Sequence, residues 1–289
     1  MSSDENSQLQ KKIGLLEKEL AKKDSEIMIY RQELGRFSQK LDFLMSQISG
    51  DIKILSQLQK SLIPTEIPSF PGFEISRKFI FGSKSGGDYF DIFEHEDKMK
   101  FGILVASSSG YAMSALFLSL ILKVSHVLEA KKGNSPDKIL QQIADELKKV
   151  AAPQDTTSAF YGVIDRRSFT LQFCSAGNMD GYYMVPHKPI QVLKSTNSAF
   201  GQQFSEKLTM AALDLDPKSR ICLVSEGVSE LLGVEGVVKV IGDNAKGSVH
   251  ELRNELLFQA QRKSGLEEPL KDQTVIVVEV KDRVIKLAK

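Results

Sequence analysis

The first 62 residues carry a seven-residue pattern of apolar positions. Apolar side chains recur alternately three and four residues apart, with breaks only at Lys23 and Asp51, and Lys, Glu and Gln fill the positions between them. So long a seam is typical of a coiled coil. At about 1.5 Å per residue the helix reaches roughly 80 Å, and a single helix cannot bury such a stripe against itself. We therefore expect a coiled-coil stalk over residues 9–62 that forms a parallel homodimer; a helix folded back on its own globular domain is the alternative. The seam residues are Leu9, Ile13, Leu16, Leu20, Ile27, Tyr30, Leu34, Phe37, Leu41, Leu44, Ile48, Leu55, Leu58 and Leu62.

The pattern changes after the stalk. Pro64, Pro68 and Pro71 mark a linker over residues 63–72, and β-type alternation begins at Phe73. Two blocks of strands surround a pair of helices, which predicts an α+β domain over residues 73–281 with two sheets and helices outside them. Residues 1–8 are expected to be disordered, and residues 282–289 form a C-terminal tail. The expected strands are 73–81, 89–94, 98–105, 157–164, 169–175, 181–185, 207–213, 220–224 and 274–280, and the expected helices of this domain are 111–130, 136–150 and 249–262.

Composition narrows the class of protein. The 38 basic and 37 acidic residues nearly cancel, which argues against a general nucleic-acid-binding protein because that function needs a strong basic field. The polar first residues do not resemble a signal peptide, and the longest apolar run, 112–122, is too short to span a bilayer. Cys174 and Cys222 lie in apolar strand-like runs and are expected to be buried. We therefore expect a cytoplasmic protein without a membrane span.

The candidate chemistry begins at residues 85–91, whose sequence is Ser-Gly-Gly-Asp-Tyr-Phe-Asp. Glycines let the backbone approach an ion closely, and Asp88 follows Gly87 directly, so Asp88 is placed like a ligand of a hard cation at the end of a turn. The alternative is a Gly-Gly hairpin turn with a solvated aspartate.

Further motifs follow this one in a specific order. Together they resemble the SpoIIE/RsbU-like branch of the PPM (PP2C-type) serine/threonine phosphatases, whose members carry "LQ-x-x-LLP", "GGD-[FY]-[FY]-D", "D-x-SGHG-x-x-A", "AGH", "TDG-x-x-E" and "DD-x-T". The resemblance covers residues 55–280, and the order and spacing are more specific than any single motif. The matching stretches here are 58–64 (LQKSLIP), 85–91 (SGGDYFD), 107–112 (SSSGYA), 175–178 (SAGN), 225–230 (SEGVSE) and 271–274 (KDQT).

The resemblance implies an αββα sandwich and a phosphatase that uses two Mn²⁺ or Mg²⁺ ions held by four acidic positions. Asp88 matches the first position. Ser107 stands where the family has the aspartate shared by both metals, Glu226 replaces the aspartate of "TDG", and Lys271 replaces the first aspartate of "DD-x-T". The formal charge of the four positions therefore changes from −4 in the family to −1 here. Asn178 also replaces the histidine of "AGH".

These departures leave no residue that we assign as catalytic. Asp88 and Glu226 are the remaining candidate metal ligands, and Ser107 and Lys271 are degenerate positions. Gly87, Asp91 and Asp272 are possible auxiliary residues, since Asp272 lies one position from the lost ligand. A shift of one residue would, however, turn its side chain to the other face of a strand.

Two functional hypotheses follow. The first is a pseudophosphatase that acts by binding, with no metal cofactor, in partner-switching signalling. Its partner would be a STAS-type anti-sigma-factor antagonist or a related active phosphatase. The second is a weak or atypical Mn²⁺- or Mg²⁺-dependent phosphoserine/phosphothreonine phosphatase that acts on such an antagonist. A purely structural coiled-coil scaffold is a third possibility. In the first hypothesis, the ammonium of Lys271 acts as an internal counter-ion beside Asp88 and Glu226, although a surface lysine is the alternative.

Overall fold

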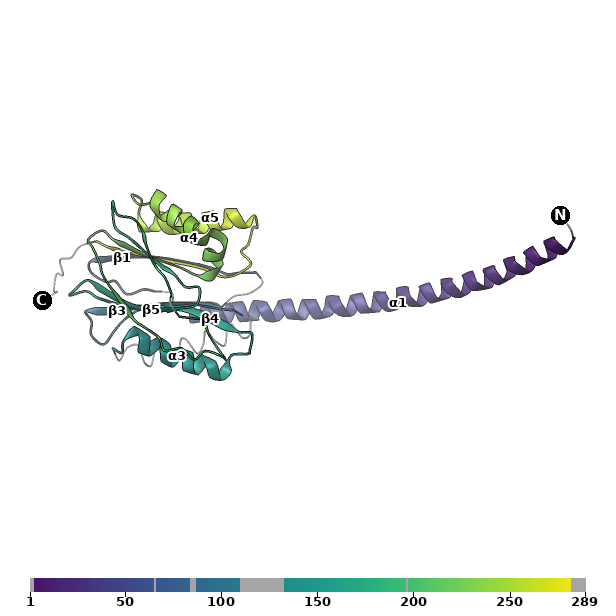
Figure 1. The fold of residues 1–289 in the computed structure, drawn as a ribbon, viewed down its shortest axis with the longest axis horizontal. Helices are drawn as coiled ribbons and strands as arrows, with labels where there is room; N and C mark the ends of the chain where they lie inside the picture. Colours follow the sequence, from purple (N-terminus) through teal and green to yellow (C-terminus); the bar gives the residue numbers. More distant parts are fainter. Residues whose placement is uncertain (1–2, 65, 84–86, 110–132, 196, 282–289) are drawn as a thin grey trace. The chain divides into compact units, whose positions relative to one another are not determined.

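The computed structural model of the chain describes residues 3–64, 66–83, 87–109, 133–195 and 197–281 (Figure 1). The chain divides into two compact units, Met1–Ile54 and Leu55–Lys289. The helix expected over 111–130 and the expected tail at 282–289 lie outside the described residues. Within the described part, no helix combines the length and the apolar character needed to cross a membrane.

The first unit consists of helix α1, Ser3–Leu62, which continues past the unit boundary. It begins earlier than the expected start of the stalk at residue 9. The side chains of the heptad seam from Ile13 to Leu44 are all at least 44% exposed in this single chain. An apolar stripe of this kind gains stability only when a partner covers it. Pairing into a coiled coil remains a prediction.

The second unit contains two antiparallel sheets. One has the strand order β1-β11-β10-β6-β7, and the other has the order β2-β3-β4-β5-β9, with β8 paired to β4. The strands of the first sheet are β1 Phe73–Ile80, β6 Gly181–Met184, β7 Gln191–Leu193, β10 Arg220–Val224 and β11 Gln273–Val280. Those of the second are β2 Asp88–Glu94, β3 Lys100–Ser108, β4 Thr156–Asp165, β5 Thr170–Ala176, β8 Phe200–Gly201 and β9 Ala211–Asp214. The strand expected over 207–213 thus begins only at Ala211.

Helices cover the outer face of each sheet. Figure 1 shows α4 (Glu226–Asp243) and α5 (Val249–Ser264) beside the sheet that contains β1, and α3 (Pro136–Val150) beside the sheet that contains β3, β4 and β5. Three apolar clusters fill the layers: Phe90, Phe160 and Ile276 belong to the one between the sheets. A second cluster packs α3 onto the sheet that contains β3 and β4. The third cluster packs α4 and α5 onto the sheet that contains β10 and β11. This confirms the expected αββα sandwich.

Local sequence signals explain two of the helices. α3 begins with Ser135 as N-cap and Pro136 in the first turn, where proline loses no helical hydrogen bond. α5 begins with a capping box between Ser248 and Glu251 and ends at Gly265, whose φ of 66° is the left-handed conformation that glycine adopts readily.

Sequence analysis missed α4. Its segment contains several glycines, which have low helix propensity, and Gly233 interrupts the helix with a φ of 69°. The helix forms because tertiary packing buries Val228, Leu232, Val237 and Ile241 against the sheet.

Candidate functional site

Asp88 is the first residue of β2 and lies opposite Ser107 of β3. Its carboxylate is buried and accepts hydrogen bonds from the hydroxyls of Ser107, at 2.6 Å, and Thr274, at 2.7 Å. Ser107 belongs to the same sheet as Asp88, whereas Thr274 belongs to β11 of the other sheet. The Asp88 side chain therefore links the two sheets at one end of the sandwich.

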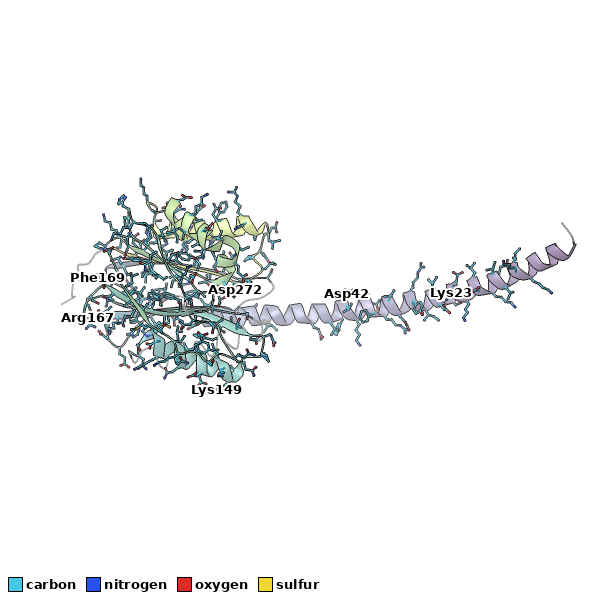
Figure 2. All side chains as sticks on the ribbon, viewed as in Figure 1. Lys23, Asp42, Lys149, Arg167, Phe169 and Asp272 are labelled. Atoms are coloured by element: carbon cyan, nitrogen blue, oxygen red, sulfur yellow. The ribbon has the colours of Figure 1, made fainter. Side chains whose placement is uncertain are left out.

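Asp272 precedes β11 and is also buried. One of its carboxylate oxygens accepts a hydrogen bond from the backbone N–H of Asp88 at 3.2 Å, and the other accepts one from the N–H of Gly82 at 2.8 Å. In Figure 2, Asp272 lies at the opposite end of the sandwich from Arg167 and Phe169. Sequence analysis could only suggest an auxiliary role for Asp272, and the structure brings it to Asp88.

Burial and a second carboxylate change the acidity of Asp88. Removal from water and the negative charge of Asp272 raise the pKa of Asp88 to about 7, while hydrogen bonds from Ser107, Ser225 and Thr274 oppose this rise. Burial and the proximity of the two carboxyl groups therefore disfavour a negative charge on both of them at once.

Lys271 forms the positive part of the site. Its ammonium nitrogen lies 3.8 Å from a carboxylate oxygen of Glu226 and 2.7 Å from one of Glu230. Partial burial opposes the charge, yet the carboxylates of Glu230, Glu226 and Asp88 raise the pKa of Lys271. Glu226 also accepts a 3.4 Å hydrogen bond from the side-chain amide of Asn178. The lysine is thus paired with the acidic residues around it.

Glu226 owes its position to the start of α4. Ser225 is the N-cap of this helix, and its backbone N–H donates a 2.9 Å hydrogen bond to the carbonyl of Thr274. Thr274 in return donates its own N–H to the hydroxyl of Ser225 at 2.9 Å. These bonds hold the start of α4 against the start of β11, which places Glu226 and Lys271 side by side.

Hydroxyl groups line the remaining wall. Ser108 shares a 3.0 Å hydrogen bond with the hydroxyl of Thr157, and Ser109 shares one of 2.9 Å with that of Thr156. The whole arrangement encloses a small cavity of about 90 Å³. The cavity is lined by Gly87, Asp88, Ser107, Ser108, Ser109, Glu226, Lys271 and Asp272.

Six of the seven candidate metal-site and auxiliary residues predicted from the sequence therefore line one cavity. Asp91 is not among its lining residues. It shares a face of β2 with Tyr89, whose hydroxyl donates a 3.4 Å hydrogen bond to it, and Tyr89 packs in the cluster on the α3 side of the sheet. Sequence analysis missed the roles of Thr274 and Glu230. The sequence did contain a signal for both residues, because Thr274 matches the threonine of "DD-x-T" and Glu230 matches the glutamate of "TDG-x-x-E".

The donor set does not fit a two-metal centre. At the position where the resemblance implies a shared carboxylate, Ser107 offers a hydroxyl group that bonds to Asp88. An ammonium group, which cannot coordinate while protonated, lies beside Glu226. Among the described residues, no three His, Cys, Asp or Glu side chains are grouped in a way that could hold a metal ion. What this arrangement can do is position hydrogen-bonding and charged groups around a small polar cavity.

Comparisons with known proteins agree with this architecture. The family model described as Stage II sporulation protein E (SpoIIE) matches residues 97–281. The phosphoserine phosphatase RsbU of Bacillus subtilis (strain 168) is 22% identical over 208 residues, which are 71% of this chain and 61% of RsbU. Protein IcfG of Synechocystis sp. is 24% identical over 200 residues, which are 60% of this chain and 32% of IcfG. The chain thus spans less than two thirds of either relative.

Solved structures share the fold. The SiaA-PP2C domain of Pseudomonas aeruginosa superposes with a TM-score of 0.66 at 20% identity, covering 82% of this chain and 98% of that domain. RsbX in complex with magnesium superposes with a TM-score of 0.61 at 16% identity, covering 75% of this chain and 99% of RsbX. At such low identity the likeness establishes the fold and leaves the chemistry to the residues of the site.

Proposed function

Because the chain belongs to the SpoIIE family of PP2C-type phosphatases, we propose that it is a pseudophosphatase. It keeps the phosphatase fold, has lost the two-metal chemistry and acts by binding another protein. The observation that carries this proposal is the ammonium group of Lys271, which pairs with Glu226 and Glu230 at the position where the family places a metal-binding aspartate.

The electrostatic argument favours loss of both metals. Two unit charges about 4 Å apart interact by roughly 4 kcal/mol at an effective dielectric constant near 20. A divalent ion beside Lys271 meets repulsion of at least this size and also loses the carboxylate that the family supplies there. In addition, the carboxylate of Asp88, which matches the first metal ligand of the family, accepts a hydrogen bond from the hydroxyl of Ser107. Lys271 thus serves as an internal counter-ion in place of the cations.

The proposed biological role is in partner switching, in the cytoplasm, with a STAS-type anti-sigma-factor antagonist as the protein that is bound. This part of the proposal draws on the likeness to RsbU, a phosphoserine phosphatase, and to a solved structure whose description concerns the bacterial stressosome. The exposed heptad seam of α1 supports a parallel homodimer, because a second copy offers the same seam in the same register.

One observation favours a second candidate function. The carboxylate of Asp272 contacts the backbone of Asp88, so the cavity retains Asp88, Asp272 and Glu226 as three acidic residues. A weak Mn²⁺- or Mg²⁺-dependent phosphatase that uses these residues is the alternative. We favour the pseudophosphatase because, among the described residues, these carboxylates are not grouped in a way that could hold a metal ion, and the ammonium of Lys271 lies beside Glu226.

Calorimetry with Mn²⁺ and turnover of a phosphoserine peptide distinguish the two candidates. The pseudophosphatase predicts no binding heat at micromolar Mn²⁺ and no turnover above that of the Asp88→Asn variant. Turnover that requires Mn²⁺ and disappears in Asp88→Asn contradicts the proposal and supports the phosphatase.

A further inference from the structure

A second cavity adjoins the degenerate site. It has a volume of about 210 Å³ and shares Lys271 with the hydroxyl-lined cavity. Three leucines make most of its wall apolar, namely Leu231 of α4 and Leu266 and Leu270 of the segment between α5 and β11. The remaining lining residues are Gly227, Glu230, Ser264 and Gln273. We call this cavity the leucine pocket.

The two rim leucines are held in place by hydrogen bonds. Leu266 and Leu270 are each 44% exposed. The backbone N–H of Leu266 donates to the hydroxyl of Ser264 at 3.3 Å, and the side-chain amide of Gln261 donates to the carbonyl of Glu267 at 3.1 Å. At the far end of the segment, the N–H of Ser83 donates to the carbonyl of Pro269 at 2.8 Å. The fold therefore fixes a turn that presents two leucines to solvent.

The rim of the leucine pocket is acidic. Glu230 lines it, and Glu267 and Glu268, which are exposed, lie between the two rim leucines in the sequence. Lys271 adds one positive charge, but Glu226 and Glu230 already pair with it. Arg262 and Lys263, the other nearby cations in sequence, line a separate polar pocket between α4 and α5. A ligand that covers the two rim leucines therefore meets the exposed carboxylates of Glu267 and Glu268.

We infer that the leucine pocket is the surface through which this protein holds its partner, and that the partner inserts an aliphatic side chain flanked by lysine or arginine. The inference rests on the proposed function, since it assigns the binding surface of the proposed pseudophosphatase. Basic flanking residues complement the acidic rim, which sets partner choice and association rate. The cavity is smaller than the roughly 300–1,000 Å³ typical of small-molecule sites, which favours a single side chain of a protein segment.

Fluorescence anisotropy with a labelled peptide tests this assignment on the full chain in EDTA. The probe peptide carries one leucine with two lysines on each side; one matched peptide has glutamates in place of the lysines, and another has serine in place of the leucine. We expect the probe to bind at least fivefold more tightly than either matched peptide. Failure of the probe to bind, or equal binding of the glutamate peptide, overturns the inference.

Variants locate the binding. Leu266→Ser/Leu270→Ser and Glu267→Lys/Glu268→Lys should each weaken binding of the probe at least fivefold, whereas Phe258→Ser, which removes an exposed apolar side chain of α5, should leave it unchanged. If the leucine variant fails to fold, the charge-reversal variant decides, because Glu267 and Glu268 are exposed. Binding that survives both changes overturns the inference.

The outcome is separable from that of the proposed function. Absence of probe binding together with absence of Mn²⁺-dependent turnover overturns the leucine pocket and leaves the pseudophosphatase. Probe binding that requires the rim leucines, found together with Mn²⁺-dependent turnover, supports the leucine pocket and overturns the pseudophosphatase.

Discussion

The hydroxyl group of Ser107 donates a 2.6 Å hydrogen bond to the buried carboxylate of Asp88. In a metal-binding relative of this fold, an aspartate at position 107 would repel Asp88 unless cations lay between the two. Here a neutral donor lets the two strands β2 and β3 meet directly. In the proposed pseudophosphatase, this hydrogen bond stabilises the pair of strands without metal ions.

This relationship predicts a measurable coupling between the two residues. A buried hydrogen bond to a charged group contributes about 1.5–3 kcal/mol, so Ser107→Ala should lower the free energy of unfolding by about 2 kcal/mol. Urea unfolding of Ser107→Ala, Asp88→Asn and the double variant gives the coupling energy. Strictly additive effects of the two changes speak against the bond.

Gly227 predicts a steric effect at the start of α4. A Cβ atom at this position would lie 2.1 Å from the carbonyl oxygen of Asp272, so Gly227→Ala must displace the backbone beside the site. We expect a loss of about 2 kcal/mol or more in the free energy of unfolding. In the same helix, a Cβ at Gly236 meets nothing closer than 3.4 Å. Gly236→Ala should therefore be neutral or stabilise by up to about 1 kcal/mol. Equal melting temperatures of the two variants would refute this packing argument.

His95 predicts how stability depends on pH. Burial and the charge of Lys100 lower the pKa of His95 to about 4, against the opposing charge of Asp97. Below its ordinary pKa of about 6.5, the histidine takes up a proton in the unfolded chain and stays neutral in the folded one. The free energy of unfolding should therefore fall as the pH drops from 6.5 to 4, by at most about 3 kcal/mol from this residue.

The His95→Gln variant should show a shallower loss of stability over this range, because glutamine does not titrate and can still bond the hydroxyl of Tyr161, which lies 3.3 Å from the histidine ring. Urea unfolding at pH 4.5, 5.5, 6.5 and 7.5 provides the comparison. His187→Asn is a matched control at an exposed residue with a φ of 65°, a conformation that asparagine tolerates. The same slope in wild type and His95→Gln contradicts the prediction.

The heptad seam predicts the oligomeric state. Light scattering at micromolar concentration should give a dimer for the full chain and a monomer for residues 55–289, which form the second compact unit. Leu34→Lys/Leu41→Lys should give monomers, since both leucines lie on the exposed seam of α1. Gln32→Lys/Gln39→Lys, at outer heptad positions, should remain dimeric. A monomeric full chain would show that the seam does not pair.

The sequence was sufficient for most of the fold. Helix α3 and strand β10 match their expected ranges, because period and capping residues set their limits locally. Helix α4 could not be predicted, since its glycine-rich segment becomes helical through packing against the sheet.

The contacts of the site depended on the folded chain. The bond between Lys271 and Glu230 joins residues 41 positions apart, and the direction of the Asp272 side chain depends on where β11 begins. Motif spacing placed these residues in one site, but it contained no information on which side chain pairs with which. For that reason the sequence left the role of Asp272 open and suggested only in part that of Lys271.

The most direct test of the central claim is Mn²⁺ binding by calorimetry in the wild type and in Ser107→Asp/Glu226→Asp/Lys271→Asp. The triple change restores the formal charge of the four family positions from −1 to −4, and Lys271→Asp alone should contribute most, because it removes a repelling charge and adds a ligand. We predict no binding in the wild type and measurable binding in the triple variant, with at most weak phosphatase activity because Asn178 still departs from the family. Mn²⁺ binding by the wild type with turnover that depends on Asp88, or a folded triple variant that binds no Mn²⁺, would contradict the account.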